Sequence, residues 1–249
     1  MPTHLDLAIQ AAREAGALLR EHFETDLNVD AALDHDIKLE LDVRSQELIT
    51  DRLLGAFPDH AIYGEEGIAG HQDSPCQWIV DPIDGTVNYF YGIPHFCVSI
   101  ALREQGVLTT GVIYDPMLDE LFAVEAGGIP TRNGKPIQAS SRTALKDAIV
   151  TIGFSKSKEA MEAGMTRYRE IAYQVRKTRM LGSAALALAY IACGRLDAYI
   201  EEQISLWDIA AGQLLVEAAG GSVRLSDSTS HPDKWGIVAH NGKLPLDAI

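Results

Sequence analysis

The spacing of apolar residues divides the first eighty positions into helices and short strands. Apolar side chains recur at every third or fourth position over residues 3–24 and again over residues 43–57, where Pro58 follows, so both stretches are predicted to be amphipathic helices. Short runs rich in β-forming residues at 61–63 and 78–80 predict buried strands. Both strands lead directly to an acidic residue, the first to Glu65 and the second to Asp81.

The rest of the chain changes from strands alone to alternating strands and helices. Predicted strands at 97–102, 107–114 and 120–124 are separated by turns, and a further turn at Asn133-Gly134 completes a β-meander over residues 96–137. Beyond it, strands are predicted at 149–152, 177–180, 196–200, 223–225 and 237–239, and helices at 158–175, 184–193 and 206–219. This order predicts a mixed α/β (α+β) fold with helices layered on sheets. We expect one unit over residues 1–249, in which an N-terminal α+β lobe (1–140) and a C-terminal α/β lobe (141–249) share a cleft.

Composition and charge narrow the range of partners. With 249 residues, 47% of them hydrophobic, the chain can bury a sizeable core. Its net charge of −14 disfavours a nucleic acid partner, because binding to the phosphate backbone relies on Lys and Arg. The excess of acids suits a protein that concentrates metal cations, although most of these acids are expected to form a solvated surface.

The cysteines and the apolar segments predict a cytoplasmic protein without membrane contact. Cys76, Cys97 and Cys193 form no C-x-x-C pair and are interpreted as reduced thiols. Residues 1–6 lack the features of a signal peptide, and the longest apolar run, 184–193, is far shorter than the roughly 20 residues that span a bilayer.

Candidate chemistry is concentrated in residues 78–86, Trp-Ile-Val-Asp-Pro-Ile-Asp-Gly-Thr. The predicted strand delivers the carboxylates of Asp81 and Asp84, and Pro82 is expected to end its ladder in a turn. Gly85 lets the backbone approach a ligand closely, and a helix opening at Thr86 would direct free N–H groups at the same point. Because carboxylates repel phosphate, such a site fits phosphate only if divalent cations lie between the two. Taken alone, the Asp-Gly pair is equally compatible with an ordinary turn.

Two further motifs complete a recognisable set. Gly64-Glu65-Glu66 precedes this stretch, and Trp207-Asp208-Ile209-Ala210-Ala211-Gly212 follows far downstream. In this order the three motifs resemble those of the inositol monophosphatase family, over about residues 36–221. The resemblance implies the family's layered α-β-α-β-α sandwich of the sugar phosphatase type, a homodimer, two or three bound Mg²⁺ ions and inhibition by lithium. The P-loop motif G-x-x-x-x-G-K-S/T and the dinucleotide motif G-x-G-x-x-G are absent from the sequence.

The resemblance also assigns roles to individual residues. The implied metal ligands are Glu65, Asp81, the backbone carbonyl of Ile83, Asp84 and Asp208. The implied catalytic residues are Thr86 and Asp42, which match the pair that orients and deprotonates the attacking water, together with Glu65. The implied substrate-binding residues are Asp84, Gly85, Thr86, Ser183, Ala184 and Glu201. For Asp42 and Asp208, an acid in the first turn of a helix is the structural alternative.

One segment departs from the family pattern. Relatives often carry Asp-x-Val-Thr ahead of the catalytic aspartate and a lysine several residues earlier. Here Lys38-Leu39 replaces the Val-Thr pair, and the position of the earlier lysine falls near Ala31. Asp42 keeps its spacing, so the departure bears on the surrounding loop, on a third metal ion and on the substrate.

The resemblance implies a magnesium-dependent phosphomonoesterase, an inositol-phosphate phosphatase that hydrolyses myo-inositol 1-phosphate or a similar small phosphorylated metabolite by attack of a metal-activated water. Histidinol phosphate, fructose 1,6-bisphosphate and 3′-phosphoadenosine 5′-phosphate remain alternative substrates, because relatives share the metal motifs and differ in the leaving-group pocket. A non-catalytic interaction protein on the same scaffold is the alternative of another class.

Overall fold

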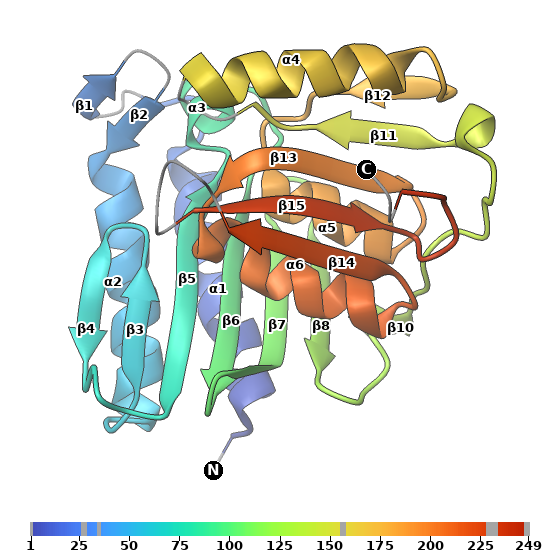
Figure 1. Ribbon diagram of the computed structural model, residues 1–249. Helices are drawn as coiled ribbons and strands as arrows, with labels where there is room; N and C mark the ends of the chain where they lie inside the picture. The colour runs from blue at the N-terminus through green and yellow to red at the C-terminus, as the bar shows by residue number, and fades with distance from the viewer. Residues whose placement is uncertain (1, 26–28, 34–35, 155–157, 228–233, 247–249) are drawn as a thin grey trace.

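The computed structural model describes the chain except residues 1, 26–28, 34–35, 155–157, 228–233 and 247–249, and for residues 29–33 and 36–38 it describes the backbone alone (Figure 1). The larger sheet consists of β3 (Ala61–Gly64), β4 (Gly67–Gly70), β5 (Cys76–Asp84), β6 (Cys97–Glu104), β7 (Val107–Asp115), β8 (Glu120–Glu125), β9 (Thr131–Arg132) and β10 (Lys135–Pro136). These eight strands lie in the order β10-β9-β8-β7-β6-β5-β3-β4, and β3 and β5 are its parallel pair. The predicted β-meander is therefore confirmed.

A second sheet of five strands comes from the C-terminal half. It consists of β11 (Ile149–Ile152), β12 (Lys177–Arg179), β13 (Ala198–Ile204), β14 (Ser222–Asp227) and β15 (Trp235–His240). Their order is β12-β11-β13-β15-β14, with β11 parallel to both of its neighbours and the remaining pairs antiparallel. A separate two-stranded hairpin, β1 (Val29–Leu33) and β2 (Asp36–Leu39), stands between the first two helices in chain order.

Helices fill the three layers around and between the sheets. Their bounds are α1 (His4–His22), α2 (Glu40–Ala56), α3 (Thr86–Phe90), α4 (Lys158–Ala172), α5 (Ala184–Ala192) and α6 (Leu206–Ala218). Figure 1 shows α1 and α2 behind the larger sheet, α5 and α6 between the two sheets, and α4 over the outer face of the smaller sheet. This arrangement confirms the predicted α-β-α-β-α sandwich.

Both faces of the larger sheet are buried, and the strands alternate between two cores. Trp78 and Val80 of β5 point toward the core under α1 and α2, while Ile79 points toward the core around α5 and α6. Because both faces exclude water, β5 appears in the sequence as a continuous apolar run rather than as an alternating one. For the same reason α5, enclosed between two sheets, is apolar on every side.

The prediction that Pro82 ends the strand in a turn is wrong. β5 continues to Asp84, and its pairing with β6 shifts register between Asp81, opposite Ser99, and Asp84, opposite Cys97. Two residues of β5 thus face one residue of β6, which is a β-bulge. Pro82 lies within this irregularity, where its missing N–H removes no regular ladder bond.

Other differences concern exposed or short elements. Helix α2 begins at Glu40, three residues earlier than predicted, and the hairpin β1–β2 was not predicted at all. Within that hairpin Ala31 pairs with Lys38, but the lysine side chain lies outside the described part of the structure. Strand β4, Gly-Ile-Ala-Gly, is mostly exposed and has no alternating pattern, so no sequence signal for a strand exists there.

Candidate active site

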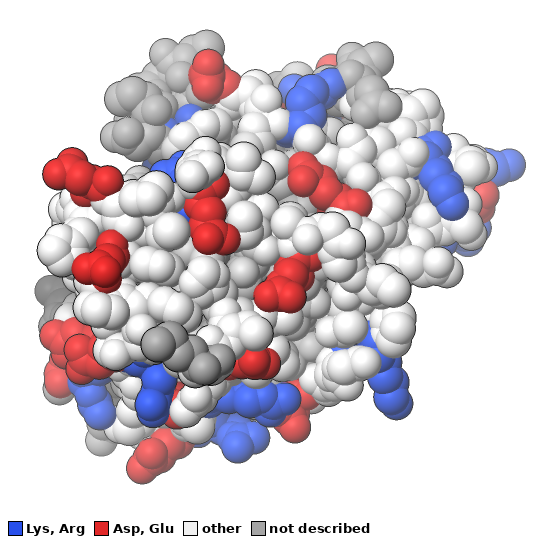
Figure 2. Space-filling model, turned by 90° about the horizontal axis from the view of Figure 1, so that it is seen from below, with Lys and Arg blue, Asp and Glu red and all other residues white. Residues whose placement is uncertain are grey.

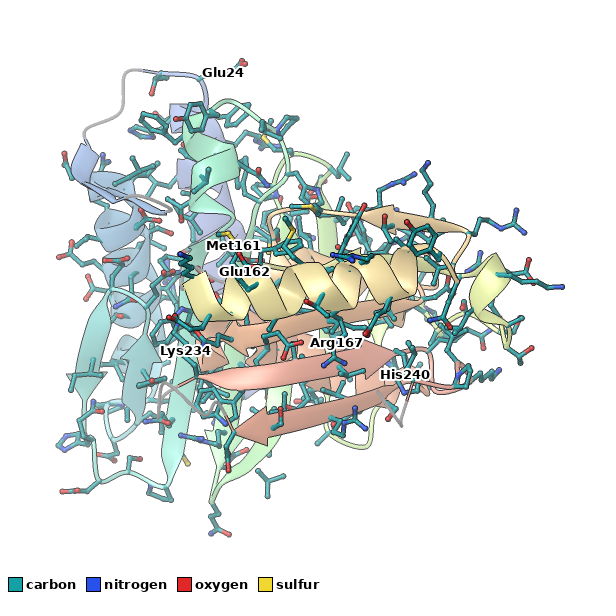
Figure 3. All side chains as sticks on the ribbon, turned by 45° about the horizontal axis from the view of Figure 1, so that its top comes forward. Glu24, Met161, Glu162, Arg167, Lys234 and His240 are labelled. Atoms are coloured by element: carbon teal, nitrogen blue, oxygen red, sulfur yellow. The ribbon has the colours of Figure 1, made fainter. Side chains whose placement is uncertain are left out.

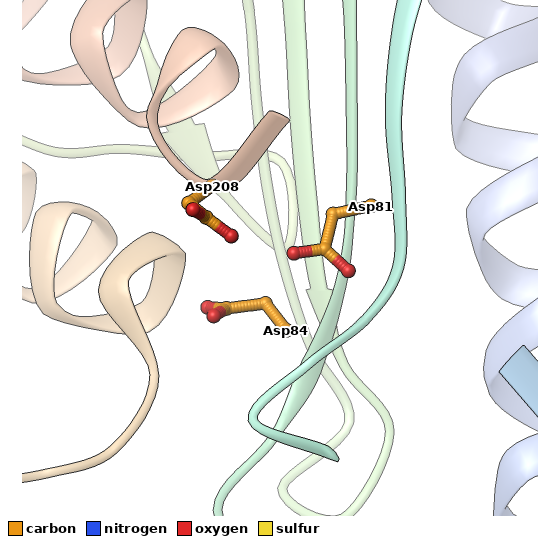
Figure 4. A group of neighbouring side chains, drawn as sticks. All are labelled: Asp81, Asp84 and Asp208. Carbon is orange, nitrogen blue, oxygen red and sulfur yellow. The ribbon is translucent and has the colours of Figure 1, made fainter. Parts of the chain in front are cut away.

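The bulge in β5 directs two carboxylates to the same place. Positions 81 and 84 are three apart, so in a regular strand their side chains would point to opposite faces of the sheet. The extra residue restores them to one side. There they meet Asp208 from the first turn of α6, and one carboxylate oxygen from each of Asp81, Asp84 and Asp208 lies within 4.8 Å of the others. Figure 4 shows the three side chains pointing toward one another.

Local hydrogen bonds orient two of these carboxylates. Oδ1 of Asp81 accepts the N–H of Ile83 across the bulge at 3.0 Å. Oδ2 of Asp208 accepts the N–H of Ser205, the residue before α6, at 2.9 Å. Asp208 therefore stabilises the start of α6 and also belongs to the acid cluster, so the structural alternative and the metal-ligand assignment are compatible.

Asp84 links the bulge to the start of α5, a contact that the sequence did not indicate. Its Oδ2 accepts the N–H of Ala185 at 2.7 Å, its Oδ1 accepts the N–H of Ala184 at 3.2 Å, and the hydroxyl of Ser183 also donates to it. Residues about one hundred positions apart are thereby fixed to each other. Ser183 and Ala184, which were predicted to bind substrate, line the candidate cavity and also hold Asp84.

The electrostatics of the cluster favour a bound cation. Burial, with the charges of Glu65, Asp84 and Asp208, raises the pKa of Asp81 well above its usual range. Burial and Asp208 raise the pKa of Asp84 to about 7, despite the hydrogen bonds from the start of α5. Several like charges in a dry site destabilise one another unless a cation lies between them. A set of carboxylate oxygens suits a hard divalent cation, so these residues fit the metal that the sequence implies.

Thr86 and Asp42, the implied catalytic residues, are joined by a hydrogen bond. Asp42, only 2% exposed in the first turn of α2, accepts the N–H of Leu39 on Oδ2 at 2.8 Å. The hydroxyl of Thr86 lies 3.3 Å from Oδ1 of Asp42 and 2.9 Å from the carbonyl oxygen of Ile83. Since a hydroxyl carries one proton, Thr86 donates to one of these acceptors at a time and keeps lone pairs for another donor.

Gly85 is required by the geometry of this turn. Its φ of 100° lies in the left-handed region, and a Cβ at this position would approach the carbonyl oxygens of His95 at 3.1 Å and Gly182 at 3.2 Å. The short helix α3 starts directly after it, so the chain turns sharply from the acids into α3.

A cavity of about 720 Å³ adjoins the cluster and contains most of the predicted residues. Glu65, Asp84, Gly85, Thr86 and Asp208 line it together with Ser183, Ala184 and Glu201. Burial raises the pKa of Glu201 to about 7, although the hydroxyl of Tyr199 donates a hydrogen bond to it. A Cβ on Gly153 would lie 1.7 Å from Oε2 of Glu201, so the absence of a side chain there makes room for this carboxylate.

Several lining residues were not foreseen from the sequence. They come from the smaller sheet and its loops: Gly153, Tyr199, Gln203 and Lys234. Only the register of β11, β13 and β15 brings them together, and no local motif marks that register.

Acidic and basic side chains occur together on one face of the molecule. On the face shown in Figure 2, basic side chains are scattered among acidic ones. Within the described residues, every helix is too short or too polar to cross a bilayer.

Comparisons with known proteins agree with the fold and the site. A profile of the inositol monophosphatase family matches residues 2–247. A Nus factor SuhB from Xylella fastidiosa is 41% identical over 224 residues, which cover 88% of this chain and 80% of that protein. An inositol-1-monophosphatase from Mesorhizobium japonicum is 38% identical over 242 residues, covering 95% and 91%.

Solved structures give the same result. The inositol monophosphatase from Anabaena (Nostoc) sp. PCC 7120 superposes with a TM-score of 0.83 at 38% identity, covering 96% of this chain and 90% of that one. The suhB protein of Bartonella henselae superposes with a TM-score of 0.87 at 34% identity, covering 94% and 92%. The motifs, the acid cluster and the layered fold agree with these comparisons. This chain belongs to the inositol monophosphatase family.

Proposed function

We propose that the protein is a magnesium-dependent phosphomonoesterase whose preferred substrate is myo-inositol 1-phosphate. The observation that carries the proposal is the cluster of Asp81, Asp84 and Asp208 within 4.8 Å, at the end of a cavity that also holds Thr86. A structural ion-pair network would place basic residues among the acids. Here the neighbours that shift the pKa of Asp81 are themselves acids.

The proposed ligands divide between two metal positions. Glu65, Asp81 and the carbonyl of Ile83 would hold one ion, and Asp81, Asp84 and Asp208 would hold the other. Bound Mg²⁺ ions supply a more acidic water and stabilise the negative charge on the leaving oxygen. A third metal position is proposed as an addition to these two. The segment around Lys38 bears on it, and the side chain of Lys38 lies outside the described residues.

Thr86 and Asp42 handle the proton in this proposal. When the Thr86 hydroxyl donates to Oδ1 of Asp42, its lone pairs accept a hydrogen bond from the attacking water. The water is then oriented toward phosphorus, and its proton passes through the hydroxyl to the carboxylate. The backbone N–H groups of Gly85 and Thr86 hold the phosphate oxygens.

The leaving group is assigned to the part of the cavity beside Glu201. Glu201 accepts hydroxyl protons of the polyol there, and Ser183 and Ala184 border the substrate while fixing Asp84. Carboxylates recognise hydroxyl groups well, because an ionised carboxylate is purely an acceptor. This assignment supports a polyol phosphate over a phosphate with an apolar leaving group.

The proposal includes a homodimer in the cytoplasm, inhibited by lithium. Large apolar side chains are exposed after α3 and before α5, with Tyr91 at 68%, Ile93 at 49% and Met180 at 65% exposure. Exposed apolar side chains of this size support an interface. Cys76, Cys97 and Cys193 are free thiols, which supports a reducing compartment.

Phosphate release from four substrates tests the proposal: myo-inositol 1-phosphate, histidinol phosphate, fructose 1,6-bisphosphate and 3′-phosphoadenosine 5′-phosphate, each with and without Mg²⁺. We expect Mg²⁺-dependent turnover with the highest kcat/KM for myo-inositol 1-phosphate. A clear preference for another member of the panel would retain the mechanism and overturn the substrate. If no phosphate were released from any of the four substrates, the phosphatase proposal would be overturned.

The alternative is a non-catalytic interaction protein on this scaffold. Relatives carry both names, inositol-1-monophosphatase and Nus factor SuhB. Retention of every proposed metal ligand favours the enzyme. An Asp84→Asn variant that folds but keeps its full biological activity would favour the alternative.

A further inference from the structure

We propose that Lys234 forms a subsite for a second anionic group, a phosphate ester or a carboxylate, on the leaving portion of the substrate. The inference rests on the proposed phosphatase function and extends it from polyol monophosphates to substrates with two anionic groups. Figure 3 labels Lys234 at the start of β15. It lies far in sequence from the three family motifs, so none of them indicates it.

Strand pairing places Lys234 beside the end of β13, in the wall of the cavity. Trp235 pairs with Ile204 and Ile237 pairs with Glu201, so three steps along β13 correspond to two along β15. This second bulge lies next to the candidate site, where such irregularities redirect side chains. The residue before Trp235 therefore falls next to Ser205, three positions ahead of the proposed metal ligand Asp208.

Contacts hold the lysine side chain at the cavity wall. Its Nζ donates to the hydroxyl of Ser205 and lies 5.8 Å from the centroid of the Trp207 ring. These two contacts are with neutral groups, and the positive charge also acts on the Glu201 carboxylate, where it partly offsets the effect of burial on the pKa. An ammonium group has three protons, and a ligand oxygen can accept those not given to Ser205.

Lys234 differs in charge from the other ionisable residues that line the cavity. Among the described lining residues it is the one basic side chain, and the acidic ones are Glu65, Asp84, Glu201 and Asp208. Three of these acids are assigned to metal ions. Glu201 and Lys234 then remain as an acceptor and a donor on the same wall, which suits a hydroxyl group beside a second anion.

A ratio of specificity constants tests the subsite without depending on absolute activity. For each protein, kcat/KM is measured for fructose 1,6-bisphosphate and for myo-inositol 1-phosphate at saturating Mg²⁺. We expect Lys234→Met to lower the bisphosphate-to-monophosphate ratio about tenfold or more, mainly through KM for the bisphosphate, as the loss of one charged contact does. Lys234→Arg should restore part of the ratio. Lys135→Met, a change at an exposed position in β10, should leave it unaltered.

The outcomes separate this inference from the proposed function. An equal loss of kcat/KM for both substrates in Lys234→Met would show that the lysine only supports the start of α6, and it would overturn the subsite. An unchanged ratio would overturn it as well, while turnover by the wild-type protein would keep the phosphatase proposal. If the wild-type protein released phosphate from neither substrate with Mg²⁺, the phosphatase proposal would fail and the subsite with it.

Discussion

The acids of the candidate site destabilise the folded state when no cation is bound. Asp81 and Asp84 are 1% and 7% exposed, and each has acidic neighbours. Burial of like charges raises their pKa values, because the protonated form avoids both desolvation and repulsion. A protein gains nothing in stability from such a cluster, so its presence is explained by the cations that it can bind.

The stability of the folded protein is expected to depend on pH, because the pKa of Asp84 is about 7, compared with 3.8 for an ordinary aspartate. Between these two values the folded metal-free chain holds a proton that the unfolded chain has lost, so its stability decreases as pH rises. Mg²⁺ must displace that proton below pH 7 and meets an ionised carboxylate above it. We therefore expect Mg²⁺ to raise Tm more at about pH 8 than at about pH 6.

Thermal unfolding with and without Mg²⁺ measures this difference, and NaCl at equal ionic strength is the control for screening. An equal Mg²⁺-induced change in Tm at both pH values would contradict the account of the acid cluster.

The sequence predicted the acids themselves but not what holds them. Asp81, Asp84 and Asp208 stand in motifs with fixed spacing, and the structure brings them together. The contacts of Asp84 with Ser183, Ala184 and Ala185 join residues about one hundred positions apart. No local pattern encodes such contacts, because they depend on how α5 packs against β5.

At the scale of elements, two β-bulges shape the site. The one in β5 aligns Asp81 with Asp84, and the one in β13 follows Glu201. Helix and strand periodicity predicted most elements to within a few residues, since they depend on burial alone. A bulge shifts the alternation of faces by one residue, but β5 is buried on both faces and its continuous apolar run shows no alternation in which the shift could be seen.

The packing of α5 on α6 yields a prediction about glycine. A Cβ on Gly212 of α6 would lie 2.5 Å from Cβ of Leu188 on α5, whereas one on Gly55 of α2 would meet no atom within 4 Å. We expect Gly212→Ala to lower the free energy of unfolding by about 1–3 kcal/mol through overpacking. The matched change Gly55→Ala should raise it by about 0.5–1 kcal/mol, because alanine favours the helix.

Urea unfolding of the three proteins gives both values. A Gly212→Ala protein as stable as the wild type would contradict the close approach of α5 and α6.

At the scale of the whole molecule, the two sheets share a layer. The core around α5 and α6 includes Ile79 and Phe122 from the larger sheet and Tyr199 and Ile237 from the smaller one. Neither sheet can lose this layer without exposing its inner face. We therefore propose that the predicted lobes, 1–140 and 141–249, unfold as one unit.

Single-tryptophan variants test this proposal. One variant keeps Trp78 in β5 and another keeps Trp235 in β15, with the remaining tryptophans changed to phenylalanine. In each variant the fluorescence midpoint in urea should coincide with the midpoint of far-UV circular dichroism. A Trp235 signal that changes at lower urea than the circular dichroism would show a separately unfolding C-terminal lobe.

The central claim is that the acid cluster is a metal site that hydrolyses phosphate esters. Its most direct test is the initial rate of phosphate release from myo-inositol 1-phosphate at about pH 8, as Mg²⁺ is titrated into the wild-type protein and into Asp81→Asn. Asparagine retains an oxygen that can accept the Ile83 N–H and removes only the charge shared between the proposed ions. We predict that the wild-type rate requires Mg²⁺ and that folded Asp81→Asn stays at background at every Mg²⁺ concentration. A wild-type rate independent of Mg²⁺, or Mg²⁺-dependent turnover by Asp81→Asn at the wild-type rate, would contradict the account.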